Sequence, residues 1–122
     1  MALIKTNQGF YNATPGSSNI QFNYNQPVGA DNFISALVMF KNKTNNISIP
    51  TYGGVAMTKL FEYYNNAYRV AVYGTLSPLT GTNQFRIANT SQWNPASVIL
   101  TSFTGSSGFG VRNQNLANAT PN

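Results

Sequence analysis

The ionisable side chains of this 122-residue sequence set the first limits on its chemistry. Histidine and cysteine are absent, and the only side-chain carboxylates are those of Asp31 and Glu62. General acid–base catalysis needs a group that titrates near the working pH, and two distant acids could form a catalytic pair only if the fold brought them together. The many hydroxyl groups lack a histidine to activate them; a Ser–Lys pair remains an open route to a nucleophile, but no motif marks one. We therefore expect a protein that is not an enzyme and has no catalytic residues.

The same scarcity argues against metal and cofactor sites. Zinc sites are built from cysteine and histidine, and a tight calcium site needs more carboxylate oxygens than two acids supply. The glycine-rich segment 105–110 lacks the Lys-Ser/Thr pair and the helix of a phosphate-binding loop, which favours a flexible turn. We expect no metal and no cofactor. Asp31 is expected to act as a turn or cap acceptor, and Glu62 as an exposed strand residue or a partner of Lys59 or Arg69.

Charge is sparse, and positive where it occurs. Charged residues make up 7% of the chain, against roughly 25% in an ordinary globular domain, and the net charge is +5. A surface of amides and hydroxyls costs less to desolvate than a charged one, so this composition suits burial against other copies of the chain. The cations are scattered and form no run. An attraction to nucleic acid or acidic glycans is the weaker interpretation, and nucleic acid is not an expected partner.

The N-terminal residues and the apolar runs bear on location. The sequence begins MALIK, without the long apolar segment of a secretory signal, and no apolar run approaches the roughly 20 residues of a membrane span. We expect a protein that is made in the cytoplasm, does not enter a membrane and is not exported by the usual route, unless a signal has already been removed.

Tyrosines provide the one cluster that could bind a ligand. Tyr63, Tyr64, Tyr68 and Tyr73 fall within one predicted hairpin beside Arg69. Exposed aromatic rings next to cations can stack on sugars or bases. Tyrosine is also common on strands because it packs well on a pleated surface, and we favour core and interface packing over ligand stacking. Glycan binding remains an alternative.

Other large apolar groups lie outside the predicted strands. The loop residue Trp93 is expected either to cover one end of the core or to anchor an interface. Residues 106–122 are rich in Gly, Ser and Asn, which is typical of a partly ordered tail or of an arm that lies on a neighbouring subunit. The candidate interface residues are Tyr63, Tyr64, Tyr68, Trp93, Phe109, Val111 and Leu116.

Apolar residues recur with a period of two, which predicts strands rather than helices. The predicted strands are 2–11, 19–24, 32–40, 57–64, 67–76, 82–88 and 96–103. Segment 32–40 is apolar almost throughout and is expected to be a central strand covered on both sides. Asn65 and Asn66 are expected to form the turn of a hairpin between 57–64 and 67–76. The pattern predicts an all-β protein: an antiparallel β-sandwich, Ig-like or jelly-roll-like, over residues 1–105, with an extended C-terminal arm over 106–122.

Three blocks of sequence, taken together, carry a family resemblance. They are PTYGGVAMTKL at 50–60; RVAVY at 69–73 followed by PLTGTN at 78–83; and SVILTSFTG at 97–105 followed by VRNQ at 111–114. In this order they resemble β-sandwich domains found in phage virion proteins and in large bacterial surface or adhesion-like proteins. The resemblance spans about residues 33 to 121 and implies no catalytic residues. The sequence departs from the pattern in two ways. Residues 106–110 are an insertion before the VRNQ segment, and the sequence ends at Asn122, where related domains continue into further strands.

The resemblance implies a structural role. We expect a subunit of a phage particle, either a capsid decoration or cement protein or a tail component, located in the virion and made in the host cytoplasm. Its expected partners are copies of itself and a major capsid or tail protein, with neighbouring subunits completing or covering an open sheet edge. The alternative location is the cell surface or an extracellular filament, and the alternative functions are a glycan-binding adhesin-like module or a single-stranded nucleic-acid-binding protein.

Overall fold

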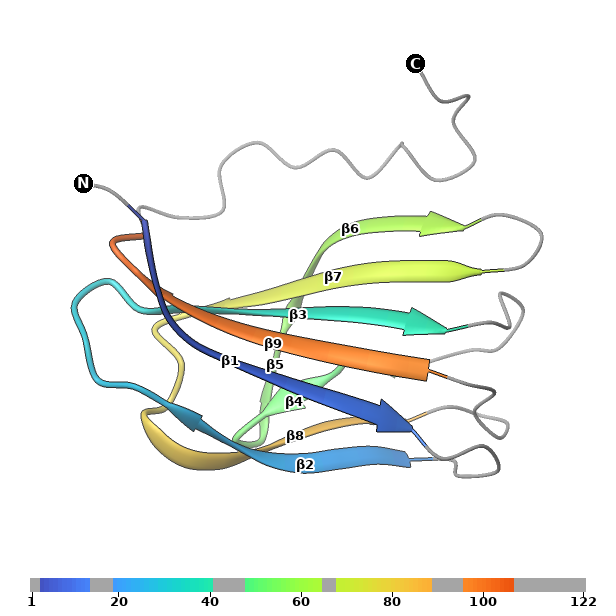
Figure 1. Cartoon of the computed structure of the whole chain (residues 1–122), viewed down its shortest axis with the longest axis horizontal. Coiled ribbons are helices and arrows are strands. Elements are labelled where there is room, and N and C mark those ends of the chain that lie inside the picture. The colour runs from blue at the N-terminus through green and yellow to red at the C-terminus, as the bar shows by residue number, and fades with distance from the viewer. Residues whose placement is uncertain (1–2, 14–18, 41–47, 65–67, 89–95, 107–122) are drawn as a thin grey trace, which may run out of the picture.

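The fold is a sandwich of two antiparallel sheets, seen in a computed structural model that describes residues 3–13, 19–40, 48–64, 68–88 and 96–106 (Figure 1). The described strands are β1 (Ile4–Ala13), β2 (Asn19–Gln26), β3 (Phe33–Phe40), β4 (Thr51–Tyr52), β5 (Val55–Ala56), β6 (Thr58–Tyr64), β7 (Arg69–Leu76), β8 (Gly81–Ala88) and β9 (Ala96–Thr104). A five-stranded sheet has the order β1-β9-β3-β7-β6, and a four-stranded sheet has the order β2-β8-β4-β5. The predicted all-β sandwich is therefore confirmed.

The pairing of the strands is nested. β1 pairs with β9, β2 with β8, β3 with β7, and β4 with β5, all antiparallel. This is the pattern obtained when one long hairpin is rolled up so that successive pairs alternate between two sheets, as in a jelly roll. β6 adds one further strand beside β7. Of the two sandwich types expected from the sequence, the pairing is that of the jelly roll.

Alternating residue types decide which side of each strand enters the core. In β2 the inward residues Ile20 and Tyr24 alternate with exposed amides, and in β8 Phe85 and Ile87 point inward between exposed polar residues. The short hairpin β4–β5 turns at Gly53 and Gly54, which both have positive φ values of 59° and 81°. Each of its strands is only two residues long, and the sequence pattern did not predict them.

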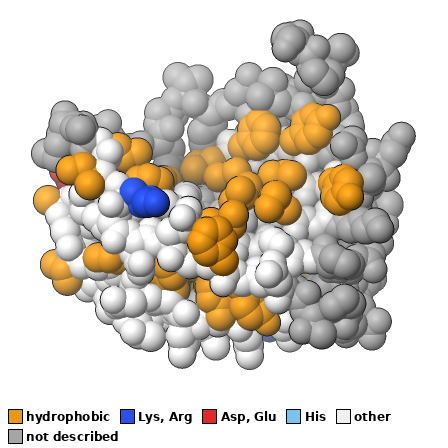
Figure 2. Space-filling view, in the orientation of Figure 1, with side chains coloured by type: hydrophobic (Ala, Val, Ile, Leu, Met, Phe, Trp, Pro, Cys, Tyr) orange, Lys and Arg blue, Asp and Glu red, His pale blue; other side chains and the backbone are white. Residues whose placement is uncertain are grey.

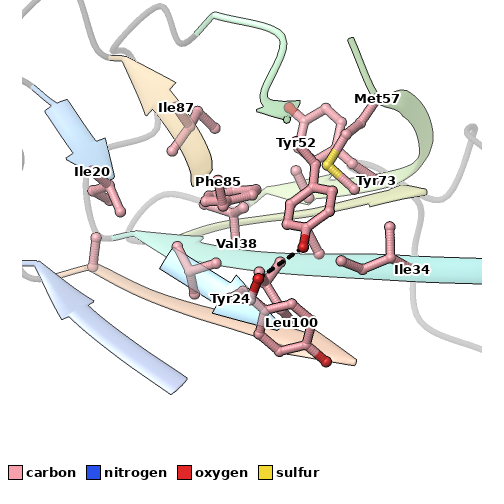
Figure 3. Packing of buried hydrophobic residues seen from close by; sticks show 14 of the residues in the cluster. Ile20, Tyr24, Ile34, Val38, Tyr52, Met57, Tyr73, Phe85, Ile87 and Leu100 are labelled. Carbon is pink, nitrogen blue, oxygen red and sulfur yellow. Dashed lines mark hydrogen bonds between the residues drawn. The ribbon is translucent and has the colours of Figure 1, made fainter. Parts of the chain in front are cut away.

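Buried side chains from both sheets form one core (Figure 3). Its members are Ile20, Tyr24, Ile34, Ala36, Val38, Phe40, Tyr52, Met57, Ala71, Tyr73, Phe85, Ile87, Ala96, Val98 and Leu100. Tyr52 lies between the sheets and donates a hydrogen bond of 2.9 Å to the backbone oxygen of Tyr24, which ties the short β4 to β2 (Figure 3).

A polar network lies inside this core, between the four-stranded and five-stranded sheets. The Ser102 hydroxyl on β9 donates to Oε1 of Gln26 on β2 at 2.6 Å. Because that bond uses the only proton of the serine, the Tyr24 hydroxyl must donate to Ser102 Oγ, also at 2.6 Å. Ser102 and Gln26 are almost completely buried, so these bonds supply the partners that buried polar groups need.

The prediction for the apolar segment 32–40 is half right. β3 is the third of five strands, so it is central as expected. Its inward residues Ile34, Ala36 and Val38 are fully buried against the four-stranded sheet. Its outward residues are only partly covered, and Met39 is 37% exposed. The expected cover on the second side is wrong for the described part of the chain, because no second layer packs on that face.

Several expectations fall outside the described residues. The hairpin β6–β7 is present, but its predicted turn at Asn65 and Asn66 is not described. The predicted C-terminal arm 106–122 is described only at Ser106, so the proposed boundary at residue 105 remains a prediction.

Candidate interaction surface

Glu62 forms ion pairs within the hairpin β6–β7. Its carboxylate accepts a hydrogen bond of 2.8 Å from Arg69 Nε and lies 3.5 Å from Lys59 Nζ. The Arg69 guanidinium also lies 5.6 Å from the centre of the Phe40 ring. The expected pairing of Glu62 with Lys59 or Arg69 is confirmed, with both cations engaged. Its side chain is only 14% exposed, so the alternative of an exposed strand residue is wrong.

Asp31 lies in an exposed turn between β2 and β3, where it has a positive φ of 52°. Its backbone oxygen accepts a hydrogen bond of 3.1 Å from the Ser106 nitrogen. Asp31 thus serves as a turn residue through its main chain. Over the described ranges, no three residues among His, Cys, Asp and Glu gather into a metal site. The described segments also contain no helix long and apolar enough to cross a membrane.

The hairpin tyrosines do not form one stacking surface. Tyr63 is opposite Val70 on the outer side of the five-stranded sheet and is partly exposed, whereas Tyr73 points into the core and is 2% exposed. Burial raises the pKa of Tyr73 to about 12, with a further contribution from the Glu62 charge that outweighs the opposite effect of Arg69. The tyrosines therefore share a hairpin, as the sequence indicated, but a single stacking surface is ruled out because Tyr63 and Tyr73 occupy opposite faces.

The other candidate residues are only partly placed. Tyr68 is exposed and lies just before the first residue of β7. Tyr64 is the last residue of β6, but its side chain is outside the described part of the structure. The remaining candidates lie outside the described residues and stay predictions: Trp93, Phe109, Val111 and Leu116.

The structure reveals instead a broad apolar surface on the outer face of the five-stranded sheet. One row of large side chains crosses all five strands, because Leu37 on β3 is opposite both Ile99 on β9 and Val72 on β7, and these are in turn opposite Phe10 and Phe61. We call this row the ridge. Phe10 is 70% exposed at one end of it.

A row of small and polar residues runs beside the ridge, two residues away on β1, β9, β3 and β7 and three residues away on β6, where the register shifts. It consists of Gln8, Thr101, Ser35, Gly74 and Thr58, which the strand registers bring into line. Gln8 Nε2 donates to Thr101 Oγ1 at 3.1 Å, so these two polar groups satisfy each other within the row. We call this row the groove, since its side chains are shorter than those on either side.

Large side chains also flank these two rows. Beyond the groove, Phe33 and Phe103 stack with their ring centres 6.0 Å apart, and Leu76 is the next neighbour of Phe33. Beyond the ridge lies a mixed row: Asn12, Ser97, Met39, Val70 and Tyr63. A row of small or polar side chains therefore lies between two rows that contain large ones, and on β9 large and small side chains alternate along the whole strand.

Charge is nearly absent from this face. Among the described residues whose strand register places them on it, only Lys5, at one corner beside Phe103, is ionised. Figure 2 shows hydrophobic side chains spread over the face turned to the viewer, with cationic colour prominent only toward its left side. Such extensive exposed apolar surface marks an interaction site more often than a solvated face.

The outer face of the four-stranded sheet is the opposite in character. Apart from Ala88, which is opposite Asn19, its outward residues on β2 and β8 are exposed and polar: Asn19, Gln21, Asn23, Asn25, Thr82, Gln84 and Arg86. Arg86 Nη2 donates to the Asn19 side chain at 3.4 Å. The sandwich thus has one face suited to water and one suited to contact with another apolar surface.

No relative was found. The sequence matches no protein-family model, and the comparisons with curated proteins and with solved structures give no match.

The sequence carried one signal for this surface. β3 is apolar on both sides, which predicts cover on both sides, although the sandwich supplies cover on one side only. The sequence could not show that the ridge residues of five strands line up, because that depends on the registers.

Proposed function

We propose that this protein is a structural subunit that works by lasting contacts with neighbouring subunits in a particle. The particle favoured by the sequence blocks is a phage virion, with the chain acting as a capsid decoration or cement protein or as a tail component. The observation that carries the proposal is the apolar outer face of the five-stranded sheet. Covering such a face with another subunit removes apolar surface from water, which stabilises association by roughly 25 cal/mol per Å² before the costs of binding.

The two unlike faces of the sandwich fit this role. The polar face of the four-stranded sheet can remain in water while the apolar face is covered. Jelly rolls occur in viral capsid proteins and also in lectins, so the fold accommodates a structural role without specifying one.

The proposed location can be tested directly on particles. Antibodies raised against the purified chain are expected to label intact phage particles released by the strain that encodes it, at regular positions in electron micrographs. Antibodies against an unrelated cytoplasmic protein of the same strain serve as the control. Label that stays in the soluble fraction and is absent from particles would contradict the virion role.

Glycan binding is the second candidate, supported by the exposed amides of β2 and β8. Side-chain amides such as those of Asn23 and Gln84 can donate to and accept from sugar hydroxyls. This role predicts binding to a glycan array that is lost in the double variant Asn23→Ala, Gln84→Ala. The structural role predicts no change in particle labelling by that variant.

A further inference from the structure

The apolar outer face also indicates what covers it. Resting on the structural role proposed above, we propose that the outer face of the five-stranded sheet packs against the same face of a second copy, around a two-fold axis. In this dimer the ridge of each copy lies over the groove of the other.

The pattern of rows selects the direction of the axis. Successive outward residues on a strand are about 6.6 to 6.8 Å apart, so the ridge and the groove are separated by that distance. A two-fold axis that runs across the strands, midway between the two rows, exchanges them. Leu37 of each copy then lies over Ser35 of the other. An axis parallel to the strands would instead stack ridge on ridge.

The outer two rows also face each other under this axis. The Phe103 ring then lies over the small Ser97 of the other copy, Phe33 over Met39, and Leu76 over Val70. The strands of the two copies cross at the shallow angle of about 30° that aligned sheets adopt. The ridge and the groove are therefore complementary to each other across the axis, as an isologous interface requires.

Charge favours a second copy over a charged partner. Lys5 is the only ionised residue that the registers place on this face in the described part of the chain, and the dimer puts it at the rim opposite Asn12 of the other copy. No acidic or basic group has to be buried, and two identical faces do not repel each other. A partner selected by charge would find almost nothing on this face to recognise.

The area of the face is sufficient for a specific interface. Five strands spaced about 4.8 Å apart and about eight residues long cover roughly 600 Å² in projection. Two such faces together give roughly 1,200 Å², which reaches the lower end of the standard range for specific interfaces. Side-chain relief increases the accessible area above this flat value.

The decisive experiment is sedimentation velocity over a range of protein concentrations. The wild-type chain is expected to sediment as a dimer. Leu37→Lys places an unpaired charge under the other copy and is expected to raise the dissociation constant at least about 100-fold. Gln84→Lys adds the same charge on the polar face of the other sheet and is expected to leave the dimer intact. A wild-type monomer at all concentrations, or a dimer that survives Leu37→Lys, would overturn the proposal.

A second variant tests the groove without adding charge. Ser35→Trp fills the groove with a ring, and the ridge of the other copy can no longer enter it, so the dimer is expected to dissociate. Ser35→Ala keeps the groove open and is expected to remain dimeric. Circular dichroism and thermal unfolding of each variant establish that the fold is intact. If folded Ser35→Trp is still a dimer, the ridge of one copy does not occupy the groove of the other.

Failure of this inference is separable from failure of the proposed function. If the chain is monomeric but its antibodies label particles, the apolar face binds another particle protein and only the dimer is wrong. If the chain dimerises as described but is absent from particles, the dimer stands and the virion role is wrong.

Discussion

Leu37 and Ser35 are consecutive outward-facing residues of β3, and the registers assign one to the ridge and the other to the groove. Both positions are flanked by residues of their own kind on β9 and β7, so the alternation extends across the sheet. A two-residue displacement of one copy is enough to place a large row over a small one. The spacing within a single strand thus determines how two sheets can interlock.

Salt separates the structural role from nucleic-acid binding. Association through an apolar face is expected to change little between about 50 mM and 500 mM salt, because no counterions are released when it forms. Sedimentation velocity of the wild-type chain at several salt concentrations in this range measures the strength of association. A loss of association of tenfold or more at the higher salt concentration would point to an electrostatic contact.

The buried network predicts a specific loss of stability. Tyr24→Phe removes the proton donor to Ser102 and leaves that buried oxygen without one of its partners, which is expected to lower the free energy of unfolding by about 1 to 2 kcal/mol. Urea unfolding at one protein concentration measures the change. Tyr11→Phe is the matched control, since the Tyr11 ring stacks on Phe22 at 4.9 Å and its hydroxyl has no hydrogen-bond partner in the described ranges. Equal losses in the two variants would show that the network contributes nothing.

Alkaline pH should destabilise the fold through Tyr73. Its pKa in the folded protein is about 12, above the ordinary value of 10, because the ionised ring would be buried. The raised value means that stability is unaffected below pH 10 and falls as the unfolded chain ionises between pH 10 and pH 12. The expected loss from this residue is about 2 kcal/mol at pH 12.

Tyr73→Phe isolates that effect. The difference in unfolding free energy between wild type and variant is expected to be constant from pH 7 to about pH 9.5. Above that pH, the unfolding free energy of the wild type is expected to fall relative to that of the variant. Burial also raises the pKa of Tyr24 and Tyr52, so both proteins lose stability at high pH and only their difference is informative. A difference that does not change with pH would contradict the assignment.

The sequence was a good guide to strands and a poor guide to surfaces. Alternation, together with continuous apolar runs for β3 and β9, predicted the seven longer strands and the sandwich, because burial on one side of a strand leaves a period of two. It missed β4 and β5, because two-residue strands have no period to detect. It also grouped Tyr63 with Tyr73, although Tyr63 is opposite Val70, and the odd separation of three residues from Val70 to Tyr73 along β7 puts the two rings on opposite faces.

The interaction surface depended on information that local patterns do not contain. Phe10 and Ile99 become neighbours only through the pairing of the first strand with the last. Most of the residues singled out from the sequence as interface candidates lie outside the described structure, whereas the ridge is made of residues that resemble ordinary core positions. Only the apolar character of both sides of β3 pointed to it.

A distance measurement across the dimer tests the central claim most directly. The chain has no cysteine, so Asn23→Cys on the polar face of the four-stranded sheet gives a single site for a nitroxide label. Face-to-face packing places four sheets between the two labels, with three spacings of about 10 Å, so double electron–electron resonance is expected to give a distance of about 30 to 40 Å. The signal should vanish when Leu37→Lys is added. A distance below about 20 Å, as expected when the edges at β1 and β2 join those of another copy, or no intermolecular distance at all, would contradict the account.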